Sequence, residues 1–159
     1  MLPRNQFFRQ TRAEINLDHI RHNISEFRRA IPKSMKMMAV LKADAYGHGA
    51  VPVAREALAS GVEYLAVAFL DEALELRRYG IRCPILVLGY TAPDDVPVAL
   101  EHDIALTVYT DEVLERIRTA YKKNKARIHI KLDTGMGRIG LHHKESAIAF
   151  IRKAVQMEG

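Results

Sequence analysis

Five short apolar runs recur along the chain, and each has the length of a β-strand. Four of them are hydrophobic at nearly every position, which is typical of strands buried on both faces of a parallel sheet. The spacing between successive runs leaves room for one helix each time. The runs are residues 37–41, 64–69, 84–88, 103–108 and 127–132.

Segments with apolar residues at helical spacing separate these runs, and most of them end at glycine or proline. The first stripe comprises Ile20, Ile24, Phe27 and Ile31 and ends at Pro32. The others are Ala54, Ala57 and Leu58 before Gly61; Ala73, Leu74 and Leu76 before Gly80; Val113, Leu114 and Ile117 after a Thr110 cap; and Ile148, Ile151 and Val155 beside Phe150. Because strand-helix-strand crossovers are right-handed, this alternation predicts a parallel sheet.

The fifth run decides between a doubly wound sheet and a barrel. Arg127, His129, Lys131 and Asp133 alternate with apolar residues, so one face of this strand is polar. In a barrel that face points into the lumen, where catalytic groups gather at the carboxyl ends of strands, whereas a doubly wound sheet more often buries both faces. We predict an α/β fold, the N-terminal portion of a (β/α)8 TIM-type barrel with about five parallel strands, not closed within this chain.

Residues 1–18 are expected to form an N-terminal strand or tail outside the barrel. Ala13, Ile15 and Leu17 alternate there with polar residues, which is the pattern of a half-buried strand. Residues 19–159 would then form the partial barrel.

The formal charge of +5 raises the question of a nucleic-acid partner. We expect none, because the basic residues lie on the expected outer faces of several helices and no aromatic residues are interleaved with them as a stacking platform would require. These residues are Arg28, Arg29, Arg77, Arg78, Lys122, Lys123 and Lys125. A solvated helix surface explains them better.

The sequence also argues against a membrane partner and a disulfide framework. No apolar stretch approaches the ~20 residues that span a bilayer, and the first residues lack a leader pattern, so we expect a cytoplasmic protein. Cys83 is the only cysteine, and we expect it to pack as a small hydrophobic residue.

Lys42 directly follows the first apolar run, in the segment Lys42-Ala43-Asp44-Ala45-Tyr46-Gly47-His48-Gly49. A lysine that ends a buried strand is in a setting that favours the neutral amine, which is the form that makes a Schiff base. The plainer reading is a lysine that reaches out to solvent from the strand end. For His48 we expect a loop histidine satisfied by hydrogen bonds.

A second segment, Lys131-Leu132-Asp133-Thr134-Gly135-Met136-Gly137-Arg138-Ile139-Gly140, follows the fifth run. Its glycines fit a flexible turn, and they lack the spacing of a P-loop. Lys131 could pair with Asp133, and Arg138 could lie on the surface. The adjacent His142 and His143 have no partners at metal-ligand spacing, so we predict no metal.

Both segments resemble the two signatures of the alanine racemases, and the resemblance runs from about Thr11 to the end of the chain. It implies that Lys42 binds pyridoxal phosphate and acts as a catalytic acid-base, while Tyr46 lies against the cofactor phosphate. It also implies that Lys131 is carbamylated and orients Arg138, which contacts the cofactor's phenolic oxygen and the substrate carboxylate. Leu88 is expected to line the cofactor pocket.

By this resemblance the parent protein is a homodimeric enzyme that converts L-alanine to D-alanine by proton transfer on two faces. The family continues past this chain with the rest of the barrel and a β-domain, so we expect the chain alone to be inactive. Rivals are a pyridoxal-phosphate-carrying barrel protein or barrel decarboxylase, a racemase of broader specificity, and a structural fragment without activity.

Overall fold

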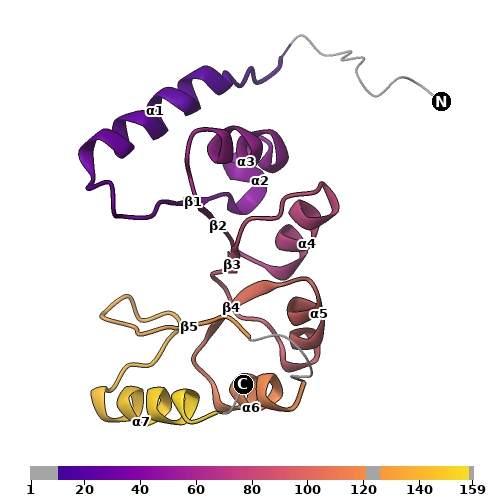
Figure 1. Cartoon of the computed structure of the whole chain (residues 1–159). Coiled ribbons are helices and arrows are strands. Elements are labelled where there is room, and N and C mark those ends of the chain that lie inside the picture. The colour runs from indigo at the N-terminus through magenta and orange to yellow at the C-terminus, as the bar shows by residue number, and fades with distance from the viewer. Residues whose placement is uncertain (1–10, 121–125, 158–159) are drawn as a thin grey trace, which may run out of the picture.

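Strands and helices alternate along the chain in a computed structural model that describes residues 11–120 and 126–157 (Figure 1). The elements are α1 (Leu17–Ala30), β1 (Met38–Val40), α2 (Lys42–Gly47), α3 (Ala50–Ala59), β2 (Tyr64–Val67), α4 (Leu70–Arg78), β3 (Ile85–Val87), the 3-10 helix η1 (Pro93–Asp95), α5 (Val96–Glu101), β4 (Ile104–Val108), α6 (Asp111–Ala120), β5 (Ile128–Ile130) and α7 (Lys144–Val155). Three of these elements, α2, η1 and α5, have no counterpart in the sequence prediction. No described helix has both the length and the apolar character needed to cross a membrane.

The five strands form one parallel sheet in the order β1-β2-β3-β4-β5. Each strand therefore pairs with the next one in sequence, as in a barrel, and Leu65 lies between Ala39 and Ile85 in the register. Among the described residues β1 and β5 remain edge strands. The predicted α/β fold with an unclosed barrel is thus confirmed.

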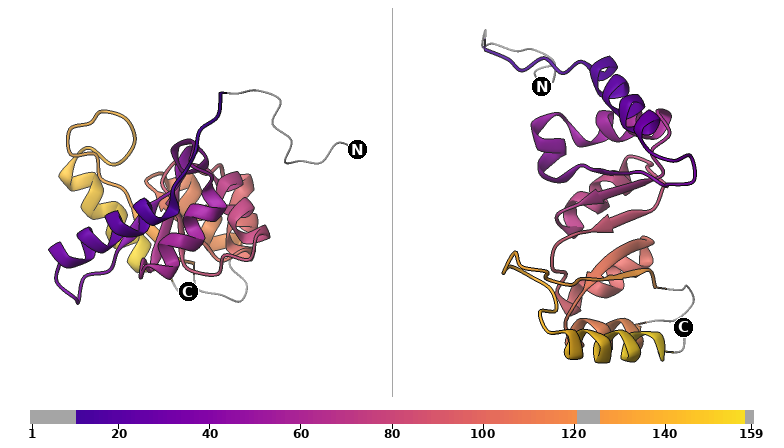
Figure 2. Two further views of the ribbon diagram at one scale, coloured as in Figure 1. Left: turned by 90° about the horizontal axis from the view of Figure 1, so that it is seen from above. Right: turned by 90° about the vertical axis from the view of Figure 1, so that its left-hand side faces the viewer.

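The strands bury different residues on their two faces. One face carries Leu65, Val67, Ile85 and Val87, and it packs against the helices in the main core. The opposite face carries a small separate cluster of Ala66, Leu86 and Ala105, with Leu88 against it. Figure 2 shows the helices arranged around the stack of strands. The prediction of two buried faces holds for β2, β3 and β4 but is wrong for β1, where Met38 and Val40 are each 38% exposed because β1 is an edge strand.

Residues 11–16 form no strand, so the predicted strand around Ile15 is wrong for this part of the chain. Asn16 instead caps α1, since its side-chain oxygen accepts from the backbone N–H groups of Asp18 (2.9 Å) and His19 (3.4 Å). The cap satisfies helix donors that have no partner within the helix and places Leu17 in the first turn. Residues 1–10 lie outside the described part of the chain.

Helix α7 turns a different face inward from the one expected, whereas α1 keeps Ile20 and Ile24 against the core and departs from its expected stripe at Phe27. In α1 Phe27 is 68% exposed, and the half-buried residue in the last turn is Arg28, which donates to the carbonyls of Met35 (2.7 Å) and Gly61 (3.0 Å). In α7 the buried residues are Ala147 and Phe150, and the stripe of Ile148, Ile151 and Val155 is largely exposed. This stripe is open because α7 lies beside the edge strand β5.

Arg77 is not on a solvated helix surface as expected but is 7% exposed. Its guanidinium donates to four backbone carbonyls, those of Ile81, Cys83, His102 and Asp103, at 2.8 to 2.9 Å. Burial lowers the pKa of Arg77, and it raises the pKa of the half-buried Cys83 thiol, which packs against the core as predicted. Lysines 122, 123 and 125 lie outside the described residues.

Candidate functional site

The backbone after β1 makes a left-handed turn. Ala43, Asp44, Ala45 and Tyr46 all have φ between 52° and 57°, although none of them is glycine. Such a conformation costs roughly 1–2 kcal/mol per residue, so the surrounding contacts must hold it. The Asp44 side chain contributes by accepting from the N–H of Ala50 at 2.6 Å, at the start of α3.

The left-handed turn brings Lys42 and Tyr46 to the same place at the carboxyl end of β1. The Lys42 Nζ atom lies 5.9 Å from the centroid of the Tyr46 ring. Lys42 is half-buried, whereas the Tyr46 side chain is 59% exposed. The His48 Nδ1 atom donates to the carbonyl of Ala45 at 2.9 Å, so His48 is a hydrogen-bonded loop histidine as predicted.

The segment after β5 folds into a loop that is closed at its base. The N–H of Asp133 donates to the carbonyl of Leu141 (2.9 Å), and the N–H of Leu141 donates to the carbonyl of Lys131 (2.9 Å). Gly140 has φ +126°, and a Cβ atom there would come within 2.8 Å of the Asp133 nitrogen. Glycine is thus required where the two ends of the loop meet.

Asp133 organises this loop from inside. Its carboxylate accepts from the N–H groups of Gly135 (2.9 Å) and Arg138 (2.8 Å). Backbone hydrogen bonds from Gly135, Gly137 and Arg138 lower the pKa of Asp133 from 3.8 to about 2. Among the described ion pairs Asp133 faces His142, at 3.8 Å, and not Lys131. The carboxylate therefore serves the backbone of the loop rather than the pair with Lys131 that was one alternative.

The middle of the site is apolar. Leu88 follows β3, is half-buried, and packs against the cluster of Ala66, Leu86 and Ala105 on the face opposite the helices. Ala66 and Ala105 have short side chains, so the surface that this cluster forms, called the apolar floor below, leaves space above it. Beyond the strand ends, the rings of Tyr90 and Tyr109 lie 6.2 Å apart, and burial together with Tyr90 raises the pKa of Tyr109.

The predicted site residues thus fall into two groups at the carboxyl end of the sheet. Lys42 and Tyr46 follow the edge strand β1, Lys131 and Arg138 follow the other edge strand β5, and Leu88 follows the central strand β3. Lys131 is half-buried and Arg138 is exposed. In the part of the chain that the structure describes, the Arg138 side chain has no hydrogen-bond partner, and no three His, Cys, Asp or Glu residues form a possible metal site.

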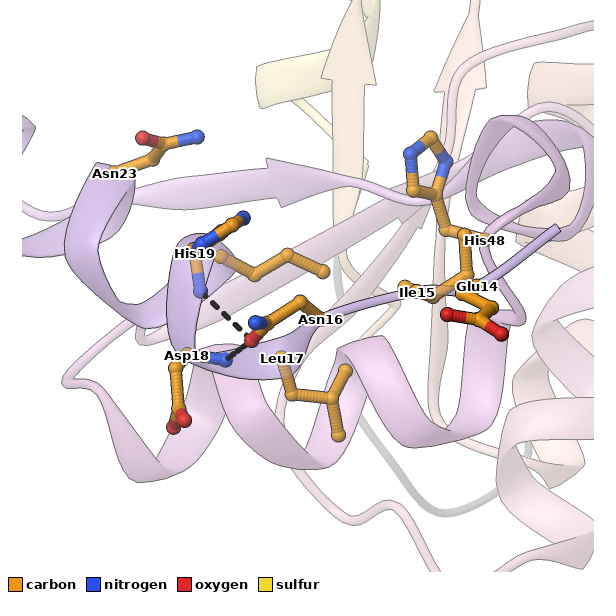
Figure 3. Close-up of a pocket in the computed structure, with 9 residues that line it drawn as sticks. Glu14, Ile15, Asn16, Leu17, Asp18, His19, Asn23 and His48 are labelled. Atoms are coloured by element: carbon orange, nitrogen blue, oxygen red, sulfur yellow. Dashed lines mark hydrogen bonds between the residues drawn. The ribbon is translucent and has the colours of Figure 1, made fainter.

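An open groove of about 730 Å3 lies elsewhere, between the start of α1 and the end of the left-handed turn (Figure 3). It is lined by residues 14–20 with Asn23 and His48, and none of the predicted site residues reaches it. Figure 3 shows Asn16 turned toward the first turn of α1, where it acts as the cap. We therefore assign the candidate site to the strand ends and not to this groove.

Sequence reasoning missed two residues that support the site. Asp133 was considered only as a partner of Lys131, although an Asp before closely spaced glycines is a pattern for a backbone-binding turn. Glu72 was given no role of its own. Its place three residues after Phe69, at the start of a helix, could have indicated a capping role.

The family profile described as "Alanine racemase, N-terminal domain" matches residues 15–159. The chain belongs to this family. Its relatives include alanine racemase 2 of Oceanobacillus iheyensis, 52% identical over 143 residues, and the alanine racemase of Geobacillus kaustophilus, 50% identical over 142.

Solved structures of alanine racemases share the fold. That of Clostridium difficile 630 in complex with cycloserine superposes with a TM-score of 0.90 at 40% identity, covering 96% of this chain and 43% of that one. A histidine racemase from Leuconostoc mesenteroides also matches, with a TM-score of 0.82 at 31% identity, covering 89% of this chain and 38% of that one. The two relatives above are covered over 36% and 37% of their length, against 89% of this chain, so the chain spans well under half of the alanine racemases it matches.

Proposed function

We propose that this chain supplies the cofactor-binding part of a pyridoxal-phosphate-dependent enzyme that interconverts L-alanine and D-alanine. The observation that carries the proposal is the left-handed turn that brings the Lys42 amine and the Tyr46 phenol together where β1 ends. The family match supports the same reading, since its relatives are named alanine racemase.

The residues present fit the chemistry of pyridoxal phosphate. The Lys42 amine can attach to the aldehyde, the Tyr46 hydroxyl can donate to a phosphate oxygen, and the apolar floor with Leu88 can contact the ring. When bound, the cofactor withdraws electrons from the substrate α-carbon and so makes its proton removable.

Lys42 would hold and move the proton on one face of the substrate. A neutral amine accepts a proton and its ammonium form returns it, so one side chain can serve both directions of the reaction. Inversion needs a second acid-base on the opposite face. We assign that group to the remainder of the protein, at the interface of a proposed homodimer.

Arg138 would bind the substrate carboxylate and the phenolic oxygen of the cofactor. A guanidinium is a planar donor that matches a carboxylate with two parallel hydrogen bonds. We further propose that Lys131, once carbamylated by carbon dioxide, becomes an anion that orients Arg138. The Asp133 carboxylate already accepts hydrogen bonds from the loop backbone. The anion that orients Arg138 would therefore be the modified Lys131 and not Asp133.

The test is a hybrid protein in which residues 1–159 replace the matching segment of the Oceanobacillus iheyensis alanine racemase 2. With pyridoxal phosphate added, the hybrid should convert L-alanine to D-alanine and exchange the α-proton for solvent deuterium. Lys42→Ala should abolish both, whereas Lys33→Ala, at an exposed lysine before β1, should change neither. The chain alone should be inactive, because its sheet is open at β1 and β5. Turnover that survives Lys42→Ala would contradict the proposal.

The substrate class needs its own comparison, because a histidine racemase shares this fold at 31% identity. The hybrid should be offered alanine, serine and histidine under the same conditions. We expect alanine to give the highest kcat/KM. A clearly higher kcat/KM for histidine would show that alanine is not the preferred substrate, while the proposal of a racemase would stand.

A further inference from the structure

Glu72 makes the contact that joins the lysine-bearing turn to the neighbouring strand-helix unit. It is a half-buried residue in the first turn of α4, and its carboxylate accepts three backbone hydrogen bonds. The Oε2 atom accepts from the N–H groups of Ala68 (2.6 Å) and Phe69 (3.0 Å), where β2 passes into α4. The Oε1 atom reaches 29 positions back along the chain and accepts from the N–H of Ala43 at 2.6 Å.

The hydrogen bond from Ala43 to Glu72 lies at the start of the left-handed turn. Ala43 is the residue directly after Lys42 and the first with positive φ in the left-handed turn. Further along, the turn is held by its own backbone, where Ala45 donates to the Leu41 carbonyl at 2.9 Å, and by the Asp44 side chain. At its first residue, Glu72 is the partner that the structure gives to the backbone N–H.

We infer that Glu72 is a positioning residue for Lys42: by holding the N–H of Ala43 it fixes the left-handed turn and so aims the lysine amine toward Tyr46. This inference rests on the proposed function for its catalytic meaning. Its structural content, the placement of Lys42 beside Tyr46, can be tested without any cofactor.

Glutamine at this position separates the two tasks of the carboxylate. A glutamine amide has one oxygen and one NH2 group, which only donates. The oxygen is expected to stay with Ala68 and Phe69, because glutamine is accepted at this helix position in a capping box. The NH2 group would then face the N–H of Ala43, and two donors form no hydrogen bond. Glu72→Gln should therefore keep the start of α4 and release the turn.

Two control variants isolate this effect. Glu75→Gln makes the same chemical change on the same helix at an exposed position, and Asp71→Asn removes a charge from the same first turn, where an acid favours the helix dipole. No side-chain hydrogen bond is described for either residue. Both controls should behave like the unsubstituted chain in every measurement.

The experiment is NMR spectroscopy on the 159-residue chain without cofactor. In Glu72→Gln the amide of Ala43 should exchange with solvent at least about tenfold faster, which corresponds to the loss of one hydrogen bond to a charged group. The ring-current shift that Tyr46 imposes on the ε-methylene of Lys42 should decrease. In the unsubstituted chain a coupling across the hydrogen bond should connect the Ala43 nitrogen to the Glu72 carboxyl carbon, a measurement that stands even if the variant does not fold.

The second measurement is the rate at which added pyridoxal phosphate attaches to Lys42. In the hybrid protein, covalent attachment at Lys42, followed by absorbance, should be about tenfold slower with Glu72→Gln and unchanged with the control substitutions. An Ala43 amide that is unaffected by the substitution, or a missing coupling, would overturn the inference. So would a released Ala43 amide with an unchanged Lys42 shift and attachment rate. If the Lys42 shift responds but the unsubstituted hybrid never binds the cofactor, the positioning role stands and the proposed function fails.

Discussion

At the residue scale, Asp133 sets the shape of the loop that carries Arg138. One carboxylate binds the N–H groups of Gly135 and Arg138, and a carboxylate accepts such bonds better than its protonated form does. The pKa of Asp133 is accordingly lowered from 3.8 to about 2. A lowered pKa means that the folded loop favours the ionised form, so its stabilisation is complete above about pH 4 and is lost as the pH falls toward 2.

A pH titration should reveal this dependence. The amide resonances of Gly135 and Arg138 are expected to shift together with a midpoint near pH 2, and Asp133→Asn should remove that transition. Asp94→Asn, at an exposed aspartate in η1, is the matched control and should leave the midpoint unchanged. A midpoint near 4 would show that Asp133 is not held by the loop.

Individual residues also show which features of the candidate site the sequence predicts and which it does not. Lys42, Tyr46, Lys131 and Arg138 could be proposed as site residues because the segments that contain them are continuous and specific. The left-handed turn was not predicted, because alanine and tyrosine carry no local preference for positive φ. Glu72 escaped notice since its bond to Ala43 spans 29 positions, a distance over which one sequence contains no pattern.

At the scale of elements, periodicity predicted where strands and helices lie better than which way they face. All five strands fall inside the predicted runs. The errors in the apolar stripes and strand faces occur at the margins of the sheet, where Phe27 of α1 and the isoleucines of α7 face outward and β1 has an open face. An apolar stripe indicates a face that can be buried, and the neighbours that would bury it are not encoded in the stripe itself.

Arg77 ties three elements together, and its removal should destabilise the fold. Its guanidinium donates to four backbone carbonyls and so joins α4 to the segments before β3 and β4. Without Arg77 these carbonyls would lose this hydrogen-bond donor. Arg77→Met should lower the free energy of unfolding by on the order of 3 kcal/mol, measured by urea denaturation. Arg78→Met, at the exposed neighbour, should change it by less than about 0.5 kcal/mol. Equal effects of the two variants would contradict the role of Arg77.

At the scale of the whole molecule, the open sheet should make the chain self-associate. An edge strand presents unpaired N–H and C=O groups, and Met38 on β1 adds exposed apolar surface. Sedimentation should show association that increases with concentration. Met38→Lys should weaken it because a charged edge resists pairing, whereas Met35→Lys, outside the strand, should not. A chain that stays monomeric at every concentration would contradict this expectation.

The central claim is that Lys42, among all the lysines of the chain, is the one that binds pyridoxal phosphate. The most direct measurement is to add the cofactor to the hybrid protein, reduce with borohydride and map the labelled peptide by mass spectrometry. The account predicts one dominant label at Lys42, which disappears in Lys42→Ala and persists in Lys33→Ala. A label spread evenly over exposed lysines such as Lys33 and Lys144, or one that persists in Lys42→Ala, would contradict it.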